Sequence, residues 1–143
     1  MFDEPHLIDT NILVYAYETG SEKRHQCVEI INGSIDSGNG VLSIQNILEF
    51  SSVVTEKVRA PLDPIAAGRI VRDFSLIFRI IGYNTGTAVN ALKSMLLYKT
   101  HFFDALLVAT MEENNIFLLI TENDRDFKNV PWLKTLNPFK RGA

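Results

Sequence analysis

Residues 102–127, FFDALLVATMEENNIFLLITENDRDF, contain the pattern that decides the fold of this chain. Their first half is helical in character and apolar nearly all round, which predicts a buried helix over 101–114. The run IFLLI at 116–120 is continuously apolar, as expected of a strand that is covered on both faces. A buried helix that leads into such a strand favours a parallel sheet with helices packed against it.

The rest of the chain repeats this alternation of short apolar runs and longer helical patterns. Further strands are expected around Leu7–Asp9, Gly40–Ser43 and Leu76–Ile81. Helices are expected from the cap Thr10 to about Tyr17, from Ser21 towards Asn32, over Gln45–Val58, after the cap Asp63 with Pro64 at the first position, and over Thr85–Leu97. Together they predict a three-layer α/β/α sandwich with a central, mostly parallel sheet. Ligands of such sheets bind beyond the carboxyl ends of the strands.

Length and composition restrict the class of protein. The 143 residues are 46% hydrophobic and 22% charged, so one folded domain over 1–143 is expected, and a disordered chain or a disulfide scaffold is excluded. No apolar run reaches the roughly 18 residues of a membrane span, and the acidic opening MFDEPH differs from a secretory signal. The lone Cys27 cannot pair within the chain, which favours a cytoplasmic location.

Three acidic residues stand alone in largely apolar stretches. Asp9 directly follows the first predicted strand, Glu49 lies about two helical turns after the second, and Asp104 lies in the first turn of the buried helix. Each is the only Asp, Glu, Lys or Arg within four residues on either side. An unpaired buried carboxylate is costly, so each acid needs a partner. Because the ends of parallel strands meet at one edge, all three can point into the same crevice.

Carboxylates gathered without a matched cation favour a hard divalent metal. Mg²⁺ and Mn²⁺ prefer oxygen ligands, and Mg²⁺ typically combines a few carboxylates with waters and substrate phosphate. A metal held in this way can activate water and stabilise negative charge on a phosphodiester. The sequence therefore predicts a Mg²⁺ or Mn²⁺ site with Asp9, Glu49 and Asp104 as ligands and catalytic residues.

Each acid also has a purely structural interpretation. Asp9 can cap the following helix, Asp104 can compensate a helix dipole, and Glu49 can face solvent on a half-exposed helix. All three interpretations must hold together for the metal site to fail, which makes the metal site the stronger hypothesis.

Four segments, in this order, resemble the PIN domain family: LIDTNIL at 7–13, SIQNILEFSSV at 43–53, FFDALLVATMEENN at 102–115 and LLITENDRDF at 118–127. The likeness is closest to the VapC-like toxins of bacterial and archaeal type II toxin–antitoxin modules. This resemblance implies an α/β/α fold and a Mg²⁺- or Mn²⁺-dependent ribonuclease. It also implies RNA as the substrate, a VapB-like antitoxin as a partner, and a homodimer.

The resemblance also implies roles for individual residues. By position, Asp9, Glu49 and Asp104 match the first three acids of the family's metal site. Asp9 and Asp104 would hold the principal metal, while Glu49 would complete its ligands or orient the attacking water. Thr10 and Thr121 would hydrogen-bond the carboxylates and fix their orientation.

The sequence departs from the family at the fourth acid. Many relatives have Thr-x-Asp after the last strand, whereas Thr121-Glu122-Asn123 places an amide there. Asn123, Asp124 and Asp126 are therefore alternative candidates for this position, and the presence of a second metal stays open.

Other chemistries have less support. His6, His25 and His101 lack the spacing of a zinc site, and Ser43 and Cys27 lack a local base or oxyanion motif.

Two other functions share part of this sequence pattern with a nuclease. A haloacid-dehalogenase-like phosphatase also starts with an Asp after a strand, but its general acid would stand two positions on, where this chain has Asn11. A PIN-like module that binds RNA or protein without turnover is supported only by Asn123.

The net charge of the chain and the positions of its basic residues indicate which partners it can bind. Fourteen Lys and Arg against seventeen Asp and Glu give a net charge of −3, which alone counts mildly against nucleic acid. The three predicted metal ligands account for that excess, so the acidity indicates a cofactor instead. Basic residues near the acids in sequence are candidates for phosphate contacts: Lys99, Arg125 and Lys128. Others, on the early helices, suit an acidic or amphipathic antitoxin segment: Lys23, Arg24, Lys57 and Arg59.

Overall fold

The computed structural model describes residues 2–140, which contain a sheet of five parallel strands. The strands are β1 (His6–Ile8), β2 (Gly40–Ser43), β3 (Arg79–Ile81), β4 (Leu118–Ile120) and β5 (Lys134–Leu136). Their order across the sheet is β3-β2-β1-β4-β5. The strand order reverses between β1 and β4, and in open parallel sheets such a reversal leaves a crevice at the carboxyl ends of the two strands.

Helices connect the strands in the described part of the chain. They are α1 (Thr10–Tyr17), α2 (Arg24–Ser37), α3 (Ile44–Glu56), α4 (Pro64–Ile77), α5 (Thr85–Tyr98), α6 (Phe102–Glu113) and the short 3-10 helix η1 (Asp124–Phe127). Several begin at a side chain that accepts a hydrogen bond from a backbone N–H of the first turn: Asp9 for α1, Ser43 for α3, Asp63 for α4 and Asn84 for α5.

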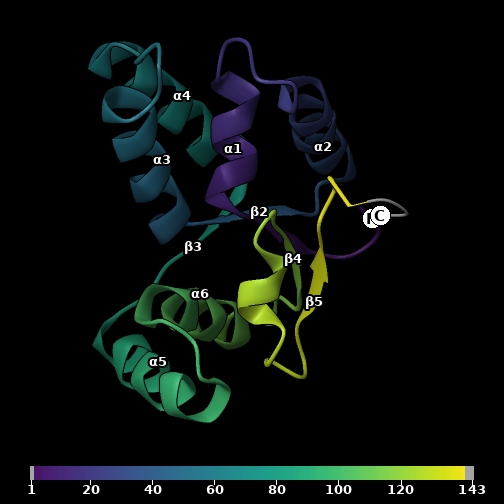
Figure 1. Cartoon of the computed structure of the whole chain (residues 1–143), viewed down its shortest axis with the longest axis vertical. Helices are drawn as coiled ribbons and strands as arrows, with labels where there is room; N and C mark the ends of the chain where they lie inside the picture. The colour runs from purple at the N-terminus through teal and green to yellow at the C-terminus, as the bar shows by residue number, and fades with distance from the viewer. Residues whose placement is uncertain (1, 141–143) are drawn as a thin grey trace.

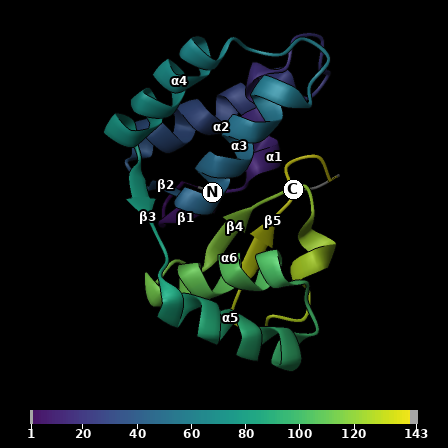
Figure 2. The same ribbon diagram turned by 90° about the vertical axis from the view of Figure 1, so that its left-hand side faces the viewer.

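The elements form three layers. Helices α1 to α4 lie on one face of the sheet, and α5 and α6 lie on the other (Figure 1). The view turned by 90° shows the sheet between these two groups (Figure 2). The predicted α/β/α sandwich is confirmed, and every strand pairing in the sheet is parallel.

Apolar side chains fill both sides of the sheet. On the α1–α4 side, the rings of Phe50 and Phe74 meet edge to face with their centroids 5.3 Å apart. Ile120 of β4 packs on this side, while its neighbour Leu119 packs with Met111 on the α6 side. Burial on both faces explains why this strand is continuously apolar.

Two strand assignments from the sequence were wrong. The strand expected over 76–81 starts only at Arg79, because Leu76 and Ile77 continue α4, where their side chains are 78% and 51% exposed. An apolar pair on a solvent-facing turn was thus mistaken for a buried strand. The edge strand β5 was not expected at all, since its polar residues give no apolar run.

Several helix boundaries also differ from those expected, among them the starts of α1 and α2. The cap of α1 is Asp9, and Thr10 is the first helical residue. Helix α2 starts three residues after Ser21 and continues past Asn32 through Gly33, against which the Phe2 ring packs. The helix ends at Ser37, and its C-cap is Gly38, whose φ of 73° is the left-handed conformation that favours glycine.

None of the helices in residues 2–140 is long and apolar enough to cross a membrane.

Candidate metal centre

The three isolated acids line one cavity at the carboxyl edge of the sheet, beside the boundary between β1 and β4. Asp9 directly follows β1, Glu49 is on α3, and Asp104 is in the first turn of α6. The cavity has a volume of about 460 Å³ and is also lined by Asn123, which follows β4. Over residues 2–140, no lysine or arginine lines it. Acids from three separate segments thus share one cavity without a matched cation.

Asp9 is the most buried of the three, with 8% of its surface exposed. Its Oδ1 accepts a hydrogen bond from the Thr10 backbone N–H at 2.8 Å, and its Oδ2 accepts one from the Thr121 hydroxyl at 2.7 Å. Burial raises the pKa of Asp9 to about 6, in spite of these two hydrogen bonds. The negative charges of Glu49 and Asp104 raise it further. Capping α1 and lining the cavity are therefore compatible roles for one carboxylate.

Glu49 is exposed, but two neighbouring side chains hold its carboxylate. The Thr10 hydroxyl donates to Oε2 at 3.1 Å, and Gln45 Nε2 donates to Oε1 at 3.0 Å. Asn46 Nδ2 donates to Thr10 Oγ1 at 3.0 Å and to Asp9 Oδ1 at 3.3 Å. A continuous network of hydrogen bonds therefore links the first two acids and limits how their carboxylates can turn.

Gln45 and Asn46 are part of this network, although nothing in the sequence analysis singled them out. Both are buried, with 7% and 1% of their surfaces exposed. Neither carries a charge, so a search for isolated charges cannot find them. The one available signal was the spacing of Ser43 and Asn46, which form a reciprocal capping box at the start of α3.

Asp104 is half-buried at the start of α6, where the helix dipole favours a negative charge. Burial raises the pKa of Asp104, and the charge of Asp126 raises it further. The charge of His101 lowers the pKa of Asp104, and the charge of Glu49 raises it by a smaller amount. A bound cation would relieve the repulsion among these acids.

The donors of this cavity suit a hard divalent cation. Carboxylate and amide oxygens are the ligands that Mg²⁺ and Mn²⁺ prefer, and the cavity supplies them without a competing positive charge. Within residues 2–140, no three acidic, histidine or cysteine side chains lie close enough together to form a preformed metal cluster. The acids line one cavity without meeting at one point, and Glu49 is exposed while Asp104 is half-buried.

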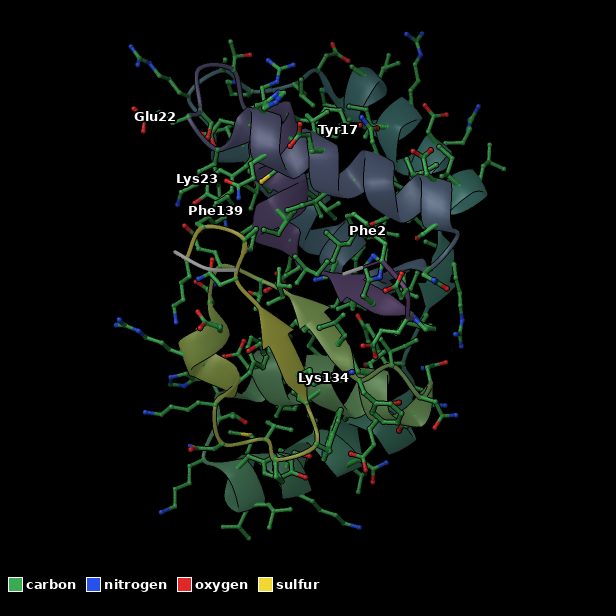
Figure 3. The ribbon with its side chains drawn as sticks, turned by 90° about the vertical axis from the view of Figure 1, so that its right-hand side faces the viewer. Phe2, Tyr17, Glu22, Lys23, Lys134 and Phe139 are labelled. Atoms are coloured by element: carbon green, nitrogen blue, oxygen red, sulfur yellow. The ribbon has the colours of Figure 1, made fainter. Side chains whose placement is uncertain are left out.

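The first acid after β4, Glu122, does not line the cavity. Glu122 accepts hydrogen bonds from Lys23 and, at 2.6 Å, from the Tyr15 hydroxyl. Lys23 also lies against Phe139, with its ammonium 4.7 Å from the ring centroid (Figure 3). Although burial acts in the opposite direction, the hydrogen bonds from Lys23 and Tyr15 hold the pKa of Glu122 below its usual value.

The candidates for the fourth position differ in their contacts. Asp124 accepts hydrogen bonds from Lys140 and from Asn137, which keep its pKa below the usual value. Asp126 is exposed and near enough to raise the pKa of Asp104, while Asn123 lines the cavity itself. These contacts favour Asn123 or Asp126 over Asp124.

The contacts of Ser43 and Cys27 are those of structural residues. The Ser43 hydroxyl accepts the Asn46 backbone N–H at 3.0 Å as the cap of α3. Cys27 is fully buried, and burial raises the pKa of its thiol to about 11, so the thiol stays protonated near neutral pH.

Comparisons with known proteins agree with this architecture. The model of the PIN domain family matches residues 6–133. A toxin–antitoxin complex from Klebsiella pneumoniae contains a chain with a TM-score of 0.67 and 22% identity, over 95% of this chain and 99% of that one. A chain of DNA-bound VapBC from Salmonella typhimurium matches with a TM-score of 0.65 and 16% sequence identity, over 94% of this chain and 98% of that one. VapC20 from Mycobacterium tuberculosis is described as a Sarcin-Ricin loop cleaving toxin. It matches with a TM-score of 0.65 and 14% sequence identity, over 80% of this chain and 86% of that one. No curated protein sequence matches.

The match to the family model spans nearly the whole chain, from β1 to the residue before β5. It includes the residues that carry the resemblance seen in the sequence, and the similar structures extend the agreement to the arrangement of the sheet and helices. The chain belongs to the PIN domain family.

Proposed function

We propose that this protein is a metal-dependent endoribonuclease that hydrolyses RNA phosphodiester bonds as the toxin of a VapBC-type pair. The observation that carries the proposal is the meeting of Asp9, Glu49 and Asp104 in one cavity without a basic side chain among its described lining residues. The burial of Asp9 and the repulsion among the three acids cost stability, which a divalent cation and its phosphate ligand would offset.

In this mechanism Asp9 and Asp104 would hold the metal, Mg²⁺ or Mn²⁺, and Asn123 or Asp126 would take the fourth position. When bound, the metal lowers the pKa of water and stabilises charge on the phosphodiester. Thr121 keeps the Asp9 carboxylate in place through its hydrogen bond to Oδ2. Glu49, held by Thr10 and Gln45, would complete the metal's ligands or orient the attacking water.

The substrate and the partner of the proposal follow from the same cavity. Phosphate groups need basic contacts that the acid cavity lacks, and Arg125 lines a neighbouring cavity that shares Asn123 with it. VapC20, which has this fold, is described as a Sarcin-Ricin loop cleaving toxin. The similar chains in toxin–antitoxin complexes suggest an antitoxin partner, which would neutralise the cavity with a cationic side chain. We also propose a homodimer and a cytoplasmic location.

Cleavage of RNA by the purified protein tests the proposal. A panel of structured and single-stranded RNAs, incubated with Mn²⁺ or Mg²⁺, is expected to give defined fragments on a denaturing gel, and EDTA is expected to stop the reaction because it removes the metal. A DNA panel of the same sequences serves as the control for substrate class.

The absence of cleavage under every metal condition would contradict the proposal. If Mn²⁺ still bound to the protein in that case, the result would favour a PIN-like module that binds RNA or protein without turnover, for which the amide of Asn123 is the structural argument.

A further inference from the structure

Gln45 connects two of the elements that supply the acids. Its Nε2 donates to Glu49 Oε1 at 3.0 Å and to the Phe103 carbonyl at 2.9 Å. Phe103 directly precedes Asp104, so one amide group contacts both the second acid and the helical turn that carries the third. In the described part of the chain, this is the only hydrogen bond between α3 and α6.

The orientation of this amide follows from its partners. Both are acceptors, a carboxylate and a carbonyl, so they require the NH₂ group of Gln45 and exclude its oxygen. The Oε1 atom is then buried with no hydrogen-bond partner within residues 2–140. The amide thus makes two hydrogen bonds through its nitrogen, and the unpaired oxygen offsets part of what they contribute to the stability of the metal-free protein. Gln45 also lines the acid cavity, so its amide lies beside the candidate metal ligands.

We infer that Gln45 is a positioning residue that holds the Glu49 carboxylate against the first turn of α6, so that Glu49 and Asp104 face the same bound metal. This inference rests on the proposed function. Glu49 and Asp104 repel each other, and Glu49 is exposed enough to turn towards solvent. The hydrogen bonds from Gln45 and Thr10 to Glu49 oppose that movement. Partners that orient a metal-binding carboxylate affect metal affinity without touching the metal.

The variant Gln45→Met tests this inference, because methionine keeps the length of the side chain and removes the amide. Isothermal titration with Mn²⁺ is expected to show a Kd raised by about 10- to 100-fold relative to the wild type. The Tm of the metal-free variant is expected to change little, because the substitution removes the two donated hydrogen bonds and the unpaired oxygen together. A purely structural residue would give the opposite pair of results, a lower Tm and an unchanged Kd for Mn²⁺.

Gln26→Met is the matched control. The Gln26 side chain also donates to a backbone carbonyl, that of Pro138, but it does not line the acid cavity. Its replacement is expected to leave the Kd for Mn²⁺ unchanged.

The outcomes separate this inference from the proposed function. If the wild type does not bind Mn²⁺, the proposed function is overturned and the inference with it. If the wild type binds Mn²⁺ and Gln45→Met binds it equally well, the inference alone is overturned. If the variant does not fold, the wild type is titrated with Mg²⁺ and followed by ¹⁵N–¹H NMR. The Gln45 side-chain amide signals are expected to shift with the same midpoint as the Asp104 backbone signal, and unchanged Gln45 signals would contradict the inference.

Discussion

Replacing Asp104 by asparagine is expected to lower the rate of Mn²⁺-dependent RNA cleavage by roughly 10³-fold or more, equivalent to about 4 kcal/mol of transition-state stabilisation. The substitution keeps the size of the side chain but removes one of the negative charges that line the cavity. A neutral amide is a weaker ligand for a hard divalent cation, and less of the charge that develops on the phosphodiester is then stabilised. Single-turnover cleavage at saturating Mn²⁺ measures the loss.

Asp36→Asn is the control for this experiment. Asp36 lies exposed on α2 and does not line the acid cavity, so the same chemical change there is expected to leave cleavage unchanged. The two variants should both unfold cooperatively, which circular dichroism can check. Equal cleavage by the wild type and Asp104→Asn would contradict the assignment of Asp104 to the metal.

Replacing Asp9 by asparagine is expected to stabilise the metal-free protein at pH 7 by about 3 kcal/mol. Burial raises the pKa of Asp9 from its ordinary value of 3.8 to about 6 in the folded protein. Between these two values the folded protein holds a proton that the unfolded chain has released. The stability contributed by this group therefore falls as the pH rises from about 4 to about 6, and its full cost is present above pH 6.

Urea unfolding in EDTA, from pH 4 to pH 7.5, measures this effect as the difference between the wild type and Asp9→Asn. The difference in the free energy of unfolding should be small near pH 4 and grow towards neutral pH. Comparing the two proteins cancels the contributions of groups such as Glu122 and Asp124, whose pKa values are lowered and act in the opposite direction. A difference that does not change with pH would show that Asp9 has no raised pKa.

The candidate acids were predictable from the sequence because each interrupts an apolar stretch with a single charge. Asp9, Glu49 and Asp104 all carry this signal, and the structure brings them to one cavity. Gln45 and Asn46 carry no such signal, because uncharged polar residues are common in helices and their value here depends on partners from other elements. Only the packed fold shows which carboxylate or carbonyl each amide meets.

The elements of the fold were predictable where they are buried, because buried elements have apolar sequences, and were less predictable where they are exposed. The strand β4, covered on both faces, is continuously apolar and was found, while the edge strand β5 has the sequence KTL and was missed. A strand was wrongly predicted at Leu76 and Ile77, because these apolar side chains lie on an exposed helical turn. An apolar run in a sequence therefore does not by itself show that the segment is buried in the fold.

The site of a bound divalent metal tests the central claim most directly. Crystals grown with Mn²⁺, measured near the manganese absorption edge, are expected to show an anomalous peak in the acid cavity, within roughly 2.0–2.3 Å of carboxylate oxygens of Asp9 and Asp104. Glu49 should lie beside the ion as a direct ligand or through a water. The absence of a peak there at millimolar Mn²⁺, or a peak only beside Asp124 and Lys140, would contradict the account.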